Sequence, residues 1–126
     1  MTSFKKLLKE NHLWYKKIGK VYCPILNERI IFNSKGFYHL RYKSSGGARS
    51  INEQMYKIGL LPLVIPVIKR ATYIHEYKKK RYSKAINKYF EIWELRAKVG
   101  KQKSEIAVVL RRVGNGNITF FSVWKN

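Results

Sequence analysis

The sequence predicts an α+β fold in which helices in the first half pack on a carboxy-terminal antiparallel sheet of about four strands. Residues 3–18 and 50–59 carry apolar side chains at helical spacing. Residues 88–98, 105–113 and 117–124 are instead rich in aromatic and β-branched side chains. Because the helices precede the strands rather than alternate with them, we expect one α+β domain over the 126 residues.

The first expected element is a basic amphipathic helix within residues 1–20. Ser3 or Thr2 is available as its N-cap, and lysines surround a rough apolar stripe. Either the lysine face is only solvated while the helix covers the sheet, or it contacts RNA phosphates or an acidic protein partner. The many lysines also interrupt any apolar core of a signal peptide.

Two short extended stretches, Val21–Leu26 and Arg29–Asn33, are expected next. A turn at residues 34–36 and the segment 37–42 follow, and then a flexible loop around Gly46.

The second helix is expected to begin at Ser50, which forms a capping box with Glu53, and to end at Gly59. Pro62 is suited to start another helical turn, and Pro66 limits its regularity. The apolar run 60–68 is too short to span a bilayer and is expected in the core, so no membrane partner is expected.

After the basic stretch Lys78–Arg81, the chain is expected to turn to strand character. The residues Gly114–Asn115–Gly116 tolerate positive φ and predict a hairpin turn between the last two strands.

The charge balance points to a polyanionic partner. The chain has 27 Lys and Arg against 7 acidic residues, a formal net charge of +20. A polyanion gains affinity for such a chain through counterion release. Since 45% of the residues are hydrophobic and 14% aromatic, a packed core is expected rather than a disordered tail. Nucleic acid is therefore the expected ligand.

The acidic residues argue against metal-dependent cleavage. All seven are Glu, whereas two-metal phosphodiester chemistry normally needs clustered carboxylates. Glu91 and Glu94 are the nearest approach to a metal-nuclease pattern, but their strand-like surroundings favour solvation or pairing with Arg and Lys. Cys23 is the only cysteine, so we expect no disulfide within the chain, no cysteine-based zinc site, and a buried small side chain. A lone cysteine favours the cytoplasm.

Several short motifs resemble the barnase, EndoU, colicin and RelE superfamily of ribonucleases, above all its phage- and toxin-type branches. They are His-Leu-Arg at 39–41 before a helix, Leu-Leu-Pro-Leu-Val-Ile-Pro at 60–66, and Ser122 beside aromatic residues in a last strand. The resemblance covers residues 30–126. The long basic insertion between Ile74 and Tyr89 departs from the family pattern.

The resemblance implies a metal-independent endoribonuclease with no cofactor, which acts as a toxin and is restrained by an acidic antitoxin or immunity protein. Such cleavage needs a base for the ribose 2′-OH, an acid for the leaving 5′-oxygen, and cations for the phosphorane.

His39 is the candidate base or acid. Arg41, on the same face as His39 if this segment is extended, would contact the scissile phosphate. Ser122 would donate a hydrogen bond to a phosphate oxygen. The candidates for further contacts to the nucleic acid are Arg49, Lys101, Lys103, Arg111 and Arg112. Arg111 and Arg112 must face opposite sides of a strand, so only one lines a given site.

Other interpretations stay open. His75 is the rival catalytic histidine, whereas His12 is expected to be simply exposed. Ser122 alternates with apolar neighbours, which also fits a structural role. A non-catalytic basic RNA- or DNA-binding module would need only the charge and the aromatic residues. A regulatory protein whose basic surface meets an acidic partner is the third class.

Overall fold

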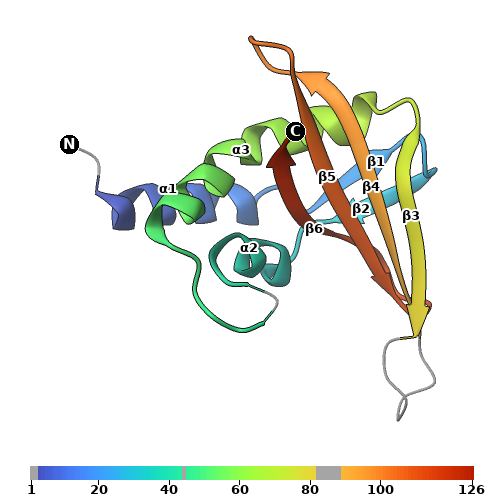
Figure 1. Cartoon of the computed structure of the whole chain (residues 1–126), viewed down its shortest axis with the longest axis horizontal. Helices are drawn as coiled ribbons and strands as arrows, with labels where there is room; N and C mark the ends of the chain where they lie inside the picture. The colour runs from blue at the N-terminus through green and yellow to red at the C-terminus, as the bar shows by residue number, and fades with distance from the viewer. Residues whose placement is uncertain (1–2, 44, 82–88) are drawn as a thin grey trace.

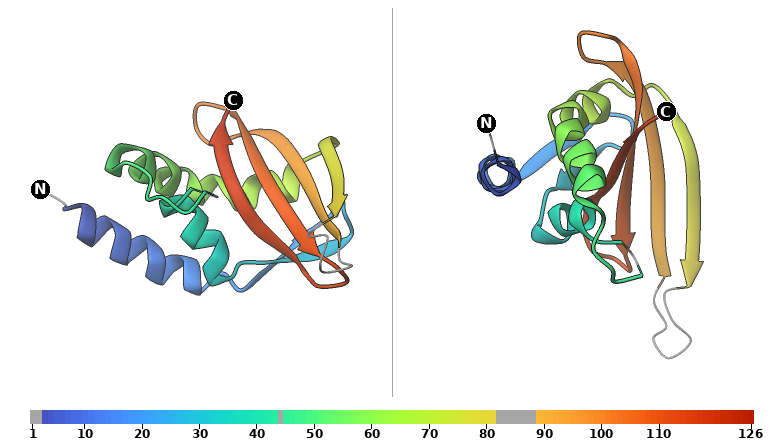
Figure 2. Two further views of the ribbon diagram at one scale, coloured as in Figure 1. Left: turned by 60° about the horizontal axis from the view of Figure 1, so that its bottom comes forward. Right: turned by 60° about the vertical axis from the view of Figure 1, so that its left-hand side comes forward.

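A computed structural model describes residues 3–43, 45–81 and 89–126 and confirms the α+β class (Figure 1). Its helices are α1 (Phe4–Lys16), α2 (Ser34–Arg41) and α3 (Ile51–Arg70). Its strands are β1 (Lys20–Cys23), β2 (Glu28–Ile31), β3 (Ile74–Arg81), β4 (Tyr89–Val99), β5 (Ser104–Val113) and β6 (Ile118–Lys125). The helices gather on one side of the sheet, and none of the described helices covers its other face (Figure 2).

The sheet is larger than expected and mixed. Within the described residues it has six strands in the order β1-β2-β6-β5-β4-β3. The expected meander is present as antiparallel β4, β5 and β6, but β2 joins β6 in parallel through the pairs Ile30↔Ile118 and Ile31↔Thr119. The expectation of about four antiparallel strands therefore omitted β3 at one end. The two short extended stretches expected at 21–26 and 29–33 overlap β1 and β2, but they were not expected to join this sheet.

The basic stretch Lys78–Arg81 is part of a strand, contrary to expectation. It lies in β3, which pairs antiparallel with β4 from Ile74↔Leu95 to Arg81↔Tyr89. A strand at the end of a sheet has one solvated edge, and the side chains of residues 74–80 are exposed. Such a strand lacks the alternation of apolar and polar residues that marks a half-buried strand.

The caps of α1 and α3 form as expected. The Ser3 side chain accepts a hydrogen bond from Lys6 N at 3.2 Å, and the Ser50 side chain accepts one from Glu53 N at 3.1 Å. However, α3 does not end at Gly59 but continues to Arg70.

The apolar stripe of α3 explains why it continues past two prolines. Its buried residues recur at helical spacing through Ile58, Leu61, Val64 and Val67. Pro62 is exposed and lies one turn before Pro66, so the backbone bonds that the prolines remove lie away from the core.

Segment 37–42 is mostly helical, which rules out the extended conformation considered for it. The Asn33 side chain caps α2 by accepting a hydrogen bond from Gly36 N at 3.3 Å. The buried residues Gly36, Phe37 and Leu40 lie on one side of the helix, so burial follows a helical rather than an alternating pattern.

Helices α2 and α3 cover the edge of β6 beyond the short β2 pairing. Lys57 Nζ donates to Val123 O at 3.0 Å, and Tyr56 Oη accepts from Lys125 N at 2.8 Å. At Gly36, a Cβ atom would lie only 2.7 Å from Phe120 O. This close approach places the side chains of α2 directly beside Phe120 and Phe121 in the first half of β6.

Candidate functional site at the edge of β6

His39 lies where α2 meets a bulge in β6. Its ring centroid is 4.3 Å from that of Phe121, with 57° between the ring planes. The β5–β6 register passes from Val109↔Ser122 to Leu110↔Phe120, so Phe121 is the extra residue of the bulge. A bulge redirects a side chain from the regular alternation of a strand, and here it sets Phe121 beside the histidine.

Two arginines complete this His39 cluster, which we define as His39, Arg49, Arg111 and Phe121. The guanidinium carbon of Arg111 lies 4.6 Å from the centroid of the Phe121 ring. Arg49 Nε donates to the backbone oxygen of His39 at 3.1 Å, and its Nη1 lies 3.5 Å from Glu53 Oε2. The cluster draws on α2, the loop before α3, β5 and β6.

The surroundings of His39 favour its neutral form. Partial burial lowers the pKa of the imidazole below its ordinary value of 6.5, and the positive charges of Arg111, Arg49 and Lys35 lower it further. A neutral imidazole has an acceptor nitrogen that can take up a proton near neutral pH, and the imidazolium formed in this way can give the proton up again. Burial and Arg49 likewise lower the pKa of Lys57, against the opposing effect of Glu53.

Arg41 does not join the His39 cluster. Two positions along an α-helix turn a side chain by roughly 200°, so His39 and Arg41 leave α2 on different sides. Arg41 Nε donates to Gln54 Oε1 at 3.2 Å, and its guanidinium lies 5.4 Å from the Tyr42 ring centroid. The same-face arrangement required an extended segment, and the helix excludes it.

Ser122 follows Phe121 on β6 and pairs in register with Val109. Its side chain is half-buried, and its hydroxyl forms no hydrogen bond within the described part of the chain. The structure therefore places Ser122 next to a member of the cluster, without a contact to His39.

Of the adjacent Arg111 and Arg112, only Arg111 lies in the cluster, consistent with the alternation of side chains along β5. Arg112 donates to Glu91 Oε1 through Nε at 3.0 Å and Nη2 at 2.9 Å. It also lies over the Trp93 ring, at 5.4 Å from the centroid, on the face that packs against the helices. Its ion pairs indicate a structural role.

Lys101 and Lys103 lie far from the cluster. Both are exposed in the turn that joins β4 to β5. Arg111 follows them by eight to ten residues, most of them in the extended strand β5. The distance along the strand from these lysines to Arg111 is therefore roughly 25–30 Å.

The other two histidines lie outside the cluster. His75 lies near the start of β3, the strand at the opposite end of the sheet from β1. Its Nε2 is 3.7 Å from Glu94 Oε2. Strands β4 and β5 separate β3 from β6, so roughly 14 Å lies between the two strands. His12 is not simply exposed, as expected, but half-buried and stacked on Phe37, with 4.5 Å between ring centroids.

The two carboxylates considered for a metal site are held apart. Glu91 and Glu94 lie three positions apart on β4 and therefore face opposite sides of the sheet. Glu91 accepts from Tyr77 Oη at 2.7 Å as well as from Arg112, whereas Glu94 accepts from Arg96 Nε at 2.6 Å. Both side chains are thus engaged in separate polar contacts.

Phe121 and Lys57 were missed in the sequence. Phe121 belongs to an aromatic pair, Phe120–Phe121, whose alternation predicts opposite faces but not a bulge. Lys57 occupies the helix after Ser50, where a lysine is ordinarily solvated. A local sequence signal for either residue is lacking, because the bulge in β6 positions Phe121 and the contact with Val123 O positions Lys57.

No protein-family model matches this chain, and no match was found among curated proteins or solved structures. None of the helices in the described ranges is long and apolar enough to cross a membrane.

Proposed function

We propose that the protein is a metal-independent endoribonuclease of the toxin type, with the His39 cluster as its active site. The observation that carries the proposal is the grouping of His39 with Arg49 and Arg111 around Phe121, on a chain with a net charge of +20. Burial and the two arginines also lower the pKa of His39. Titratable groups whose pKa is shifted by burial and by defined charge partners are candidates for functional sites.

The proposed reaction cleaves RNA at its own 2′-hydroxyl. His39 takes the proton of the ribose 2′-OH, and the 2′-oxygen attacks the adjacent phosphorus. The bond to the 5′-oxygen breaks, which leaves a 2′,3′-cyclic phosphate and, after protonation, a 5′-hydroxyl. Arg111 and Arg49 would stabilise the negative charge on the phosphorane through charge-assisted hydrogen bonds.

The departing 5′-oxygen needs a proton donor. Lys57 is the candidate on α3, because its pKa is lowered by burial and by Arg49, a member of the cluster. The alternative donor is His39 itself, which has taken up the proton of the 2′-OH and can pass it to the departing 5′-oxygen. An acidic antitoxin or immunity protein that covers these cations is the proposed partner.

A non-catalytic basic RNA- or DNA-binding module is the second candidate. Exposed aromatic side chains favour it, since bases stack on such rings without any chemistry. Among the residues that the structure describes, the exposed tyrosines are Tyr22, Tyr38, Tyr56, Tyr73, Tyr77 and Tyr89.

Incubation of the purified protein with total RNA in EDTA tests the proposal. We expect fragments with 2′,3′-cyclic phosphate and 5′-hydroxyl ends, and no cleavage by His39→Ala protein that still binds RNA. Intact RNA at high protein concentration would refute a free ribonuclease. Expression of the protein alone should also arrest growth, whereas expression of the His39→Ala variant should not.

A further inference from the structure

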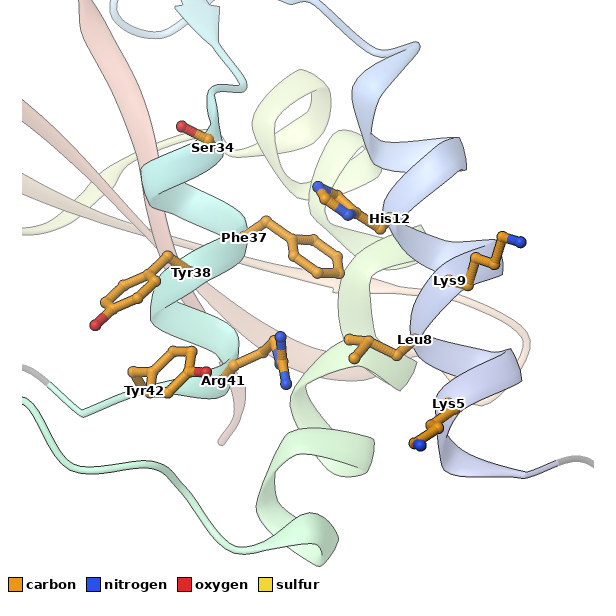
Figure 3. A pocket seen from close by; sticks show the side chains of 9 residues that line it. All are labelled: Lys5, Leu8, Lys9, His12, Ser34, Phe37, Tyr38, Arg41 and Tyr42. Carbon is orange, nitrogen blue, oxygen red and sulfur yellow. The ribbon is translucent and has the colours of Figure 1, made fainter.

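A cavity of about 400 Å³ lies between α1 and α2, on the side of α2 away from β6 (Figure 3). Its lining combines basic and aromatic side chains. Lys5, Lys9 and Arg41 supply positive charge, and His12, Phe37 and Tyr38 supply rings. No carboxylate lines it among the described residues.

The rings that line the cavity are held in place by one another. His12 stacks on Phe37 with 17° between the ring planes, and Phe37 is buried. Tyr38 stacks on Tyr42 with 4.4 Å between centroids, and half of its surface is exposed. His12 and Phe37 thus form a closed wall, whereas Tyr38 is held by Tyr42 and keeps exposed ring surface on which another flat ring can stack with little reordering.

Arg41 presents hydrogen-bond donors at this cavity. Its Nε is bound to Gln54, but its two terminal nitrogens have no hydrogen-bond partner in the described part of the chain. Figure 3 shows its side chain extending from α2 toward α1. A guanidinium in this position suits a phosphate, which accepts two parallel hydrogen bonds from it.

Tyr38 connects the cavity with the His39 cluster. It lines the cavity, and its ring centroid is 6.0 Å from that of the neighbouring His39. The cavity and the cluster therefore lie on adjoining sides of the same two-turn helix.

We propose that this cavity binds a nucleotide next to the scissile phosphate of single-stranded RNA, an inference that extends the proposed ribonuclease function. The base stacks on the half-exposed Tyr38 ring, and Lys5, Lys9 and Arg41 hold the flanking phosphates. Bases of a duplex remain stacked on each other, so only an unpaired base reaches a site between two helices.

The binding test uses a single-stranded RNA oligonucleotide with 2′-O-methyl groups, which cannot be cleaved through the 2′-oxygen. Lys5→Ala/Lys9→Ala is compared with Lys6→Ala/Lys17→Ala, which removes the same charge from exposed positions of α1 and its C-cap outside the cavity. Loss of two phosphate contacts should make the slope of log K against log salt shallower by about 1.4. The control pair should leave that slope nearly unchanged.

Stacking is tested separately at the half-exposed Tyr38. Tyr38→Ala should weaken binding of the same oligonucleotide by about 5- to 150-fold, the range for loss of one base–aromatic stack. Tyr38→Phe keeps the ring and should bind within about twofold of wild type. Circular dichroism and thermal unfolding of each variant check that α1 and α2 remain folded.

The outcomes separate this inference from the proposed function. If the lysine and tyrosine variants behave as stated while unmodified RNA stays intact, the cavity binds RNA and the ribonuclease proposal fails. Equal effects of the two lysine pairs, or wild-type affinity of Tyr38→Ala, overturn the cavity proposal even if RNA is cleaved. Equal affinity for a matched duplex, or no measurable binding of the oligonucleotide, overturns it as well.

Discussion

The His39 ring on α2 lies 4.3 Å from the Phe121 ring on β6, although 81 residues separate them in the chain. The contact depends on the bulge that sets Phe121 outside the regular β5–β6 register. Arg111 covers the same Phe121 ring. One aromatic side chain thus positions the proposed acid–base group and a proposed phosphate ligand.

His39→Ala should lower RNA cleavage by about 10²- to 10⁴-fold, the usual contribution of general acid–base catalysis. Its RNA affinity, set mainly by phosphate contacts, should change little. His75→Ala is the matched control and should cleave at the wild-type rate. The measurement is single-turnover cleavage of a defined RNA, with affinity measured in parallel. The reverse pattern would assign catalysis to His75.

Arg111→Ala and Arg112→Ala remove the same charge from adjacent positions, but the first should affect cleavage and the second should affect stability. Arg111→Ala should reduce cleavage by about 100-fold with little loss of stability, because the negative charge on the phosphorane loses a hydrogen-bond donor. Arg112→Ala leaves the half-buried Glu91 without its main partner and should lower the free energy of unfolding by about 1–3 kcal/mol. Denaturant unfolding and cleavage rates measure both. Similar effects of the two substitutions would contradict the assignment to opposite faces.

The pH dependence of cleavage should reflect the lowered pKa of His39. If the neutral imidazole is the base, kcat/KM rises with pH through that pKa and levels off below pH 6.5. Lys35→Glu replaces a positive charge that lowers the pKa by a negative one, so the rising limb should move to higher pH. NMR titration of the His39 ring protons should show the same shift. An unmoved limb would indicate that a different group titrates.

The same pKa should affect folding. Between its lowered folded value and about 6.5, the unfolded chain binds more protons at His39 than the folded chain does. The free energy of unfolding should therefore fall as the pH falls through this window. His39→Gln should reduce the slope but not abolish it, because burial also lowers the pKa of His12. Denaturant unfolding of both proteins at pH 5 to 8 measures the difference.

Gly36→Ala should destabilise the protein by a few kcal/mol and displace α2. The added Cβ would lie 2.5 Å from Tyr15 Oη and 2.7 Å from Phe120 O, so backbone must move. Gly59→Ala is the control in α3, where no atom lies within 4 Å of the added Cβ. It should stabilise the protein by about 0.5–1 kcal/mol, as Ala does for Gly within a helix. Thermal unfolding distinguishes the two signs.

Local signals in the sequence predicted the elements whose structure is decided locally. The caps at Ser3 and Ser50 form, and the turn at Gly114–Asn115–Gly116 joins β5 to β6. Buried Cys23 was also expected from its residue type and confirmed. These features depend on a few neighbouring residues or on hydrophobicity alone.

The elements that were mistaken are decided by distant packing. The end of α3 was placed at Gly59, yet its apolar stripe against the sheet extends to Val67 and Ile68. Segment 37–42 carries aromatic residues typical of strands, but α2 forms because Gly36 lets it approach β6. Where a long-range contact outweighs local preference, periodicity alone is insufficient.

The candidate site was predicted only in part. His39, Arg49 and Arg111 were selected by residue type, and the structure brings them together. Arg41, Lys101, Lys103 and Arg112 were equally basic, but helix phase, strand alternation and strand length place them elsewhere. Charge identifies candidates, whereas their grouping depends on topology.

The lysines of β3 have a consequence for the behaviour of the protein in concentrated solution. A strand at the end of a sheet offers free backbone N–H and C=O groups to a strand from another copy, which is a common start of aggregation. Lys78, Lys79 and Lys80 lie in this end strand, where their repulsion opposes the approach of a second molecule. Part of the excess positive charge thus keeps molecules apart, and neutralising these three residues should make the protein self-associate.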